Sequence, residues 1–549
     1  MARRTEGADQ LHVAYLGALV PGLDPVTGTY LGAGVGIAAV VVASRTLSRL
    51  SGVPYQVFLV LAGAAASFVP ALGHVALDPR VVFLGFVPPL VYHAGLVTSP
   101  RELRTHALPI GLGALGLVLA TTFAVAGLAS VAAPSLGFVG AFVLGAVVAP
   151  TDAVAATSVL RRLGLPPHVT TILEGESLVN DGVALALFGV GLAAVAGPTG
   201  PVAALADFLE VVAGGVAVGL VIGWLVARAY RVLPDAASQI VVSLVVPFAA
   251  YLPADALGLS GVLATLTTGL VLGQQPAPAL GASGRIRMAE FWQVLVFLLE
   301  STLFVLVGLQ LRRLLAGVSA RPAGDTALLA VLTVLAVVVV RLAWWLALPT
   351  LRWRPAGRLV DTGGVPAAER LALGWSGLRG AISLAAALSI PVAVSGHRFP
   401  GRDLVIFTTF WVIAATLVGQ GTTLPVVLRR FAVGGGRVES VQRALAQRRC
   451  AETALRVLDE LSEGGQLDGE AAEMLRVRYE RRLHRARDDV VDGAGATLSA
   501  PLSLRAAEDQ LLAAQHDMLR DLHRDGEITF SVMRAVHREL DLEHARVER

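Results

Sequence analysis

The chain has 549 residues, of which 55% are hydrophobic and only 15% are charged, and its formal net charge at neutral pH is +3. Its mean hydropathy of +0.68 and its low charge content exclude an ordinary soluble globular protein, and we expect the lipid bilayer rather than a nucleic acid as its surroundings. The sequence has no lysine and one cysteine, Cys450, so every fixed cation is an arginine and no disulfide can form within one chain.

Residues 1–28 contain Arg3 and Arg4 followed by a short apolar run. Because no clear small-residue cleavage site follows the run, we interpret this segment as a retained N-terminal leader rather than a signal peptide. Apolar runs of 17 to 28 residues then continue to residue 430, long enough to cross a bilayer as helices, whereas the short alternating segments of an outer-membrane barrel are missing. The sequence predicts an all-α polytopic transmembrane domain at 29–430.

This domain contains thirteen predicted spans, or twelve if two short runs at 238–252 and 258–273 form one hairpin or two half-buried helices. The other runs are 29–50, 55–75, 81–97, 107–132, 137–160, 170–196, 202–230, 290–312, 326–350, 373–395 and 403–430. Alternate loops are rich in arginine, which places them and the C-terminal residues in the cytoplasm of a cell (inner or plasma) membrane protein.

His93 is a lone histidine in the proline-rich span VPPLVYHAGL. We interpret it as a structural or pore-lining residue rather than a metal ligand, because no cluster of histidine and cysteine accompanies it.

The 137–160 run is interrupted by Pro150, Thr151 and Asp152. A proline inside a span removes a backbone hydrogen bond, which leaves carbonyl oxygens available next to the Thr151 hydroxyl and the Asp152 carboxylate. Broken helices at this depth mark ion sites in secondary transporters, and the alternative is a proline kink without function.

The segment 173–181, LEGESLVND, places several polar side chains inside the next span. A charge at mid-bilayer costs roughly 2.5–3.5 kcal/mol, so these side chains are expected to face a polar path through the protein. At 3.6 residues per turn, Ser177 and Asp181 share one stripe with Glu174, and Glu176 forms a neighbouring pair with Asn180. Asp152, Asp181, Ser177 and Thr151 are hard oxygen ligands suited to a small alkali cation.

Two charged residues lie in later spans. Glu300, in FLLESTLFVLVGL, has apolar neighbours, and we favour a helix-packing hydrogen bond over a role in the ion path. Arg379, in the motif GWSGLRG that opens the 373–395 span, needs an anion, and Glu176 is the expected partner. An interfacial arginine that reaches the lipid headgroups is the alternative.

After Arg430 the chain becomes polar, with helical periodicity near 438–463, 468–488, 501–525 and 527–546. We expect a cytoplasmic helical domain at 437–549, which serves either in dimerisation or folding or in regulation.

The stretches APTDAVAA, LEGESLVND, GWSGLRGAISLA and VGQGTTLPVVL together resemble the sodium/proton exchanger family of bacterial NhaP and animal NHE proteins. The resemblance covers roughly 29–430. It implies two inverted-topology repeats with broken crossing helices, a homodimer, no cofactor, and exchange of Na⁺, or K⁺ or Li⁺, for H⁺. It further implies that Asp181, with Asn180 beside it, carries the cation or the proton, that Thr151, Asp152 and Ser177 are the remaining ligands, and that Glu176 and Arg379 form a structural ion pair.

An asparagine at position 180, where other antiporters have a second aspartate, is associated in this family with electroneutral one-for-one exchange. The sequence departs from the family pattern at two places. Ala153 follows the TD motif where many members have proline, and His93 stands where many have a glutamate. Because of the second departure, we expect His93 to tune the pH set-point or the cation preference.

Two other classes of protein compete with a secondary transporter. An intramembrane aspartyl protease would use Asp152 and Asp181 as a pair that shares a proton, but neither residue has the Gly-x-Gly-Asp context expected there. A cation channel would pass current without obligatory proton counterflow. The motifs therefore favour an antiporter, which is not an enzyme.

Overall fold

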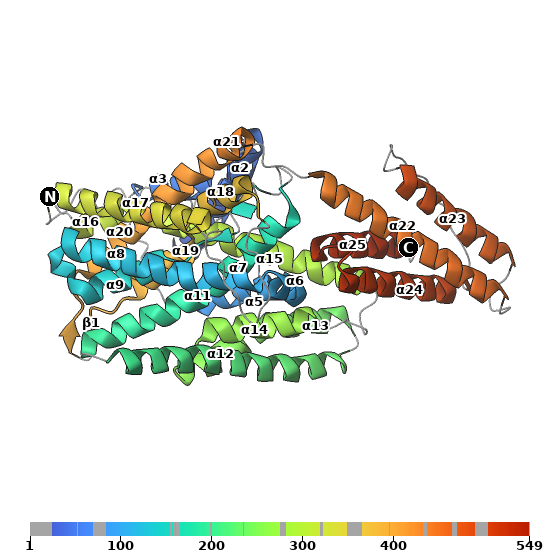
Figure 1. Cartoon of the computed structure of the whole chain (residues 1–549), viewed down its shortest axis with the longest axis horizontal. Coiled ribbons are helices and arrows are strands. Elements are labelled where there is room, and N and C mark those ends of the chain that lie inside the picture. Colours follow the sequence, from blue (N-terminus) through green and yellow to red (C-terminus); the bar gives the residue numbers. More distant parts are fainter. Residues whose placement is uncertain are drawn as a thin grey trace.

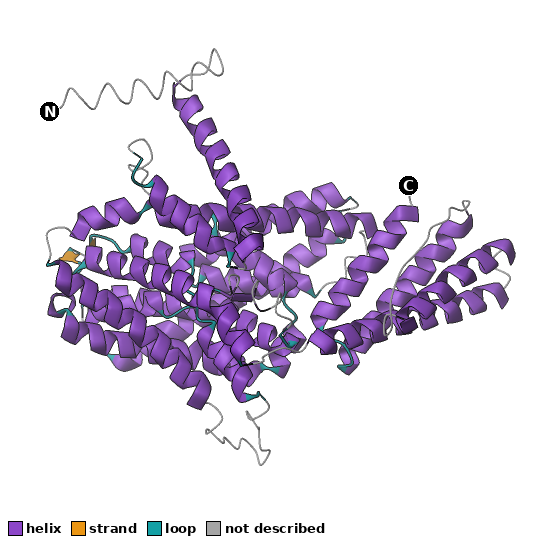
Figure 2. Cartoon of the chain, turned by 90° about the horizontal axis from the view of Figure 1, so that it is seen from above, coloured by secondary structure: helices purple, strands orange, loops and turns teal. Residues whose placement is uncertain are grey.

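The computed structural model of the protein describes most of the chain, and nearly all of the described residues are helical (Figure 2). The described residues are 25–51, 53–69, 84–153, 156–157, 160, 165–197, 200–233, 235–274, 282–318, 322–347, 365–394, 396–431, 436–463, 469–488 and 503–547. Most of the predicted leader lies outside them. Seven of the described helices are long and apolar enough to span a membrane, and four shorter apolar helices accompany them. The chain is an α-helical multi-pass membrane protein.

The membrane helices form the larger of two parts seen in Figure 1. Those before the middle of the chain are α2 (Pro25–Ser51), α3 (Tyr55–Ala66), α5 (Val87–Val97), α6 (Pro100–Thr105), α7 (Ala107–Gly111), α8 (Val118–Ala132), α9 (Gly137–Val148), α11 (Pro167–Ala196), α12 (Pro201–Tyr230), α13 (Ala236–Ala256) and α14 (Gly261–Gly273). A π-helical segment, Leu112–Leu117, joins α7 to α8, and a short 3₁₀ turn, Pro134–Leu136, precedes α9.

The later membrane helices are α15 (Ala282–Leu309), α16 (Leu311–Val318), α17 (Ala323–Ala347), α18 (Ala367–Trp375), α19 (Ala381–Ser389), α20 (Arg402–Ala415) and α21 (Gly421–Arg430). A second π-helical segment, Thr416–Gln420, joins α20 to α21, and the two-residue strands β1 (Ala393–Val394) and β2 (His397–Arg398) pair antiparallel after α19. The number of spans, twelve or thirteen, and the inverted repeats remain predictions.

Two predicted spans differ in the structure. The run at 238–252, which was expected to be short, is the 21-residue helix α13 and is long enough to span the membrane. The motif 374–380 does not open a helix but separates two, because α18 begins seven residues before Gly374 and the chain is non-helical from Ser376 to Gly380. The first turn of α18 contains polar residues such as Glu369, which are typical of a loop, so the apolar pattern did not indicate this helix.

Four helices follow the membrane part: α22 (Gly436–Glu463), α23 (Gly469–Asp488), α24 (Ser503–Asp525) and α25 (Phe530–Val547). Their bounds lie within three residues of the predicted ones, because their periodic apolar positions pack on one another. Two small clusters form in this way, one around Leu519 and Val532 and one around Leu458 and Tyr479. Figure 1 shows these helices as a second part at one end of the molecule.

Candidate functional site

The helix that contains α9 is interrupted at Pro150, as the sequence predicts. Helix α9 ends at Val148, and residues 149–152 are non-helical before helical backbone resumes at Ala153. The freed backbone is not left unpaired, because the Asp152 amide donates to the Leu378 carbonyl over 2.7 Å. The break thus places Thr151 and Asp152 side by side in the protein interior, where Thr151 is buried and Asp152 is half-buried.

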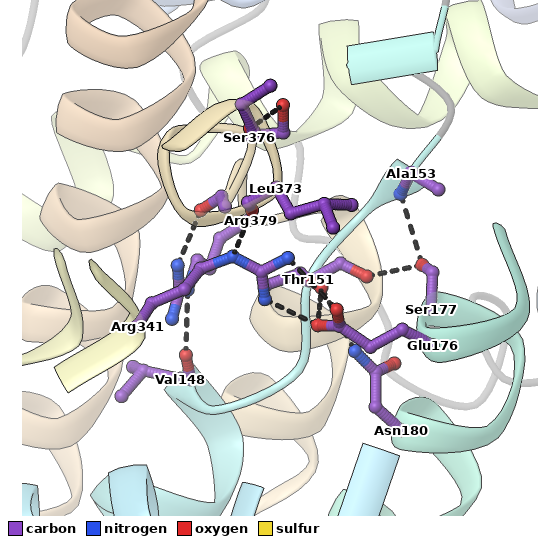
Figure 3. Close-up of polar contacts among 12 residues, drawn as sticks. Val148, Thr151, Ala153, Glu176, Ser177, Asn180, Arg341, Leu373, Ser376 and Arg379 are labelled. Atoms are coloured by element: carbon purple, nitrogen blue, oxygen red, sulfur yellow. Dashed lines mark hydrogen bonds and ion pairs between the residues drawn. The ribbon is translucent and has the colours of Figure 1, made fainter. Parts of the chain in front are cut away.

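Helix α11 presents its polar residues to this break (Figure 3). The Asn180 amide nitrogen donates to the Thr151 hydroxyl over 3.0 Å, and that hydroxyl donates to Glu176 Oε1 over 3.3 Å. The Ser177 hydroxyl donates to the Thr151 carbonyl and accepts a 3.0 Å hydrogen bond from the Ala153 amide. The structure therefore brings Ser177 and Asn180 together on Thr151, with which each of them forms a hydrogen bond.

A second break, between α18 and α19, crosses the first (Figure 3). Arg379 lies in it and is 1% exposed. Its Nε donates to the Val148 carbonyl over 3.1 Å, its Nη1 donates to the Gly377 carbonyl, and its own amide donates to the Thr416 hydroxyl over 3.2 Å. Together with the bond from Asp152 to Leu378, these contacts fasten each break to the other.

Glycine is required where the breaks meet. A Cβ on Gly380 would lie 2.7 Å from Asp152 Oδ2 and 2.8 Å from its Cβ, closer than van der Waals contact. The carboxylate of Asp152 therefore packs directly on the backbone of the second break.

The prediction that Glu176 forms an ion pair with Arg379 is wrong. The cation that binds Glu176 is Arg341 of α17, whose Nη1 and Nη2 donate to Oε1 and Oε2, the second over 3.1 Å. Arg341 also donates from Nε to the Leu373 carbonyl over 3.1 Å. Both side chains of the pair are 1% exposed, and this bidentate geometry is what makes a buried ion pair tolerable.

Arg341 was missed by sequence reasoning although a signal was present. It stands in AVVVVRLAWWLA, in the middle of a predicted span, where a charge must have a partner. Two arginines and one candidate anion were thus available, and only the packing of α17 decides between them. Arg379 instead satisfies its donors with backbone carbonyls.

Asp181 lies one turn beyond Ser177 on α11 and lines a small cavity. The cavity also touches Pro150 at the first break and Ser383 of α19, and its other lining residues are apolar. Asp181 is half-buried and lies within electrostatic range of Asp152. The neighbouring Asn180 carbonyl oxygen, Oδ1, is buried and has no hydrogen-bond partner among the described residues. The site thus offers two carboxylates and one unsatisfied neutral oxygen, the ligand type that hard alkali cations prefer.

His93 and Glu300 lie on α5 and α15. The His93 ring stacks on Trp292, with centroids 5.9 Å apart, and its tuning role remains a prediction. Glu300 accepts a 3.2 Å hydrogen bond from the Tyr55 hydroxyl of α3, which confirms the expected bond between helices. Within the described ranges no group of three or more histidine, cysteine, aspartate or glutamate side chains could hold a metal ion.

Comparison with known proteins places this arrangement in context. The profile of the family described as "Sodium/hydrogen exchanger, transmembrane" matches residues 36–430. An uncharacterized Na⁺/H⁺ exchanger of Mycobacterium tuberculosis is 34% identical over 522 residues, which cover 93% of this chain and 95% of that protein. The Na⁺/H⁺ antiporter ApNhaP of Aphanothece halophytica is 30% identical over 430 residues, covering 76% of this chain and 78% of its own.

A solved structure shows the same fold. The sodium proton antiporter MjNhaP1 of Methanocaldococcus jannaschii superposes with a TM-score of 0.55 at 18% sequence identity. The match covers 73% of this chain and 99% of that one.

Proposed function

Because this chain belongs to the sodium/hydrogen exchanger family, we propose that it is a secondary active antiporter that exchanges a monovalent alkali cation, Na⁺ in the first instance, for H⁺. The observation that carries the proposal is Asp181, a half-buried carboxylate that lines a cavity beside a broken helix, next to Asp152 and an unsatisfied Asn180 oxygen. One carboxylate in such a place can hold a cation or a proton, but not both.

The proposed cycle needs no covalent chemistry. Asp181 binds the cation with help from Asp152 and the oxygens of Thr151, Ser177 and Asn180, releases it on the other side of the membrane, and returns protonated. For these oxygens to serve as ligands, the bonds that now join Ser177 to Thr151 have to rearrange. The two crossed breaks support this role, because non-helical backbone at membrane depth frees carbonyl groups beside the carboxylates.

Charge balance supports electroneutral exchange. The Asp181 carboxylate is neutralised once in each half of the cycle, by Na⁺ or by H⁺, so the two loaded states carry the same net charge. This holds if Asp152 stays ionised and Glu176 stays paired with Arg341, as the enclosed bidentate pair favours. We expect an exchange rate that does not change when a membrane potential is imposed on proteoliposomes.

The remaining assignments belong to the same proposal. We place the protein in the cell membrane with α22–α25 in the cytoplasm, because the alternate loops expected on the same side as these helices are rich in arginine, as cytoplasmic loops are. We also infer a homodimer, and cross-linking in native membranes tests it.

The direct test is cation-driven proton flux in proteoliposomes that carry a pH-sensitive dye. We expect Asp181→Asn to show no flux above empty vesicles, because the amide can neither release a proton nor neutralise a cation. Asp403→Asn, which alters a carboxylate that is 62% exposed, serves as the control and should transport normally. Wild-type flux should follow a bell-shaped pH profile, since protons saturate the site at low pH and are lacking at high pH. Retained sodium-driven flux in Asp181→Asn would overturn the proposal.

A further inference from the structure

The membrane helices pack as two groups, and helix α3 belongs to the first. Gly63 brings α3 close to α15, because an added Cβ on this glycine would overlap the Val305 carbonyl oxygen. The Tyr55 hydroxyl adds the 3.2 Å hydrogen bond to Glu300 of α15. Helix α15 in turn packs on α5 and α13, which with α12 and α14 complete the first group.

The π-helical segment Thr416–Gln420 belongs to the second group, because it continues α20, which packs on α9 and α17. Its Thr416 hydroxyl accepts from the Arg379 amide over 3.2 Å. In the first turn of α21, the Thr423 hydroxyl accepts a 3.0 Å hydrogen bond from Trp375 Nε1 at the end of α18. The π-helical segment and the stretch VGQGTTLPVVL that follows from it therefore support the second break at two points.

The two groups meet where α3 begins and the π-helical segment ends. An added Cβ on Gly421 would lie 3.6 Å from Pro54 Cγ and 3.6 Å from Val57 Cγ2, an ordinary van der Waals distance. Gln56 stands between the last two residues in sequence, and Gln420 directly precedes Gly421. Gln56 is 0% exposed and Gln420 is 4% exposed. Each group therefore contributes one enclosed glutamine beside this contact.

Neither glutamine amide forms a hydrogen bond. The Nε2 and Oε1 atoms of Gln56 and of Gln420 are buried and have no partner within the described part of the chain. In that part of the chain, these are also the only side chains with two unpaired buried polar atoms. Buried amides are nearly always paired, because an unpaired one has lost its hydrogen bonds to water and gained none. The present arrangement is therefore unfavourable for both glutamines, at an interface between the two groups.

This interface has to change if α11 carries Asp181 between two exposures, because the second group then slides against the first. We propose that Gln56 and Gln420 bond to each other in the opposite exposure of Asp181 and so stabilise that second state. Each amide offers a donor and an acceptor, so two amides can satisfy each other. A ligand-free contact that is paired in one state and unpaired in the other shifts the balance between them. The pair rests on the proposed alternating exposure of Asp181.

Thermal unfolding of the purified full chain, followed by tryptophan fluorescence, tests whether the amides are unpaired in the present state. Gln56→Met and Gln420→Met keep an unbranched side chain of similar length and remove the amide. We expect each variant to unfold at a higher temperature than the wild type, and the double variant at a higher temperature than either.

Gln239→Met is the matched control for the unfolding experiment. Gln239 is 2% exposed, but its amide donates to the Leu233 carbonyl over 2.9 Å. Removing this paired amide should therefore lower the unfolding temperature. Unfolding temperatures at or below that of the wild type in Gln56→Met and Gln420→Met, as expected if buried water bridges the amides, would overturn the proposal.

Exchange in proteoliposomes tests the pair itself. Each single variant loses the pair and leaves its other amide unpaired in both states, so we expect the initial rate to fall about threefold or more. The double variant loses the same pair once, and it should be no slower than the single variants although it is more stable. Single variants as fast as the wild type, or a double variant slower than both, would overturn the pair. Wild-type exchange and its loss in Asp181→Asn would still stand in that case, whereas a wild type without exchange would overturn the proposed function.

Discussion

Two ion pairs in this molecule consist of the same chemical groups but have opposite surroundings. Arg341 and Glu176 are each 1% exposed and lie among membrane helices, whereas Arg476 and Asp459, which join α23 to α22, are 40% and 49% exposed. Water solvates the second pair in the folded and the unfolded protein, but the only partners of the first pair besides each other are the Thr151 hydroxyl and the Leu373 carbonyl among the described residues. The contribution of each pair to stability therefore depends strongly on how far the surroundings exclude water from it.

Breaking the enclosed pair should have the largest effect on stability. Removing one partner leaves an uncompensated buried ion, so we expect Arg341→Met or Glu176→Met alone to cost about 3–5 kcal/mol of unfolding free energy. The double variant, which leaves no charge, should recover most of that loss. Thermal unfolding of the purified protein followed by tryptophan fluorescence measures both. Equal losses in the single and double variants would show that the pair is not an isolated unit.

Arg379 provides a sharper test of the same comparison, because it is as buried as Arg341 and yet binds backbone carbonyls. Arg379→Gln removes a cation that no carboxylate contacts directly, so we expect a smaller loss of roughly 1–3 kcal/mol, the cost of the unmatched carbonyl groups. The same unfolding measurement applies, with Arg341→Gln as the matched variant. Equal losses in the two would mean that Arg379 also neutralises Glu176, as the sequence had suggested.

The arginines also show where sequence reasoning stops. Local rules found the broken helix at Pro150, the polar stripe of Ser177 and Asp181, and the neighbouring Asn180, because proline chemistry and helical periodicity act over a few residues. They could not decide which arginine reaches Glu176. That choice depends on how α17 packs beside α11, which is a contact between positions 165 residues apart. The second break was missed for a related reason, since α18, the helix that precedes it, is only nine residues long and has a charged residue, Glu369, in its first turn.

The C-terminal helical domain, α22–α25, contains a half-buried histidine whose effect on stability should be intermediate. His537 stacks on His516 with ring centroids 4.2 Å apart. Burial, then Arg285 and Arg520, lowers the pKa of His537 from 6.5 to about 4. Because the unfolded chain binds this proton more readily, the stability that the neutral ring provides is complete above pH 6.5 and is lost as the pH falls from there to about 4.

Amide hydrogen exchange of α24 and α25 in the full chain, corrected for intrinsic rates, measures that loss. Protection should fall between pH 7 and pH 5 in the wild type and should fall less in His537→Gln, whose side chain does not titrate. Glu527→Gln in the preceding turn should behave as the wild type does. Identical pH dependence in His537→Gln and the wild type would assign the effect to another group.

The exposed pair should have the smallest effect. Arg476 and Asp459 join two helices of one domain, but water and salt already screen both charges, so double-mutant cycles of such pairs give roughly 0.2–1 kcal/mol. We expect Arg476→Gln and Asp459→Asn each to change the unfolding free energy by less than about 1 kcal/mol, and the remaining effect to vanish in high salt. A larger coupling that persists in high salt would show that α22 and α23 enclose this pair more tightly in the assembled protein than in the single chain, and an interface between two copies of the domain would then be the enclosing surface.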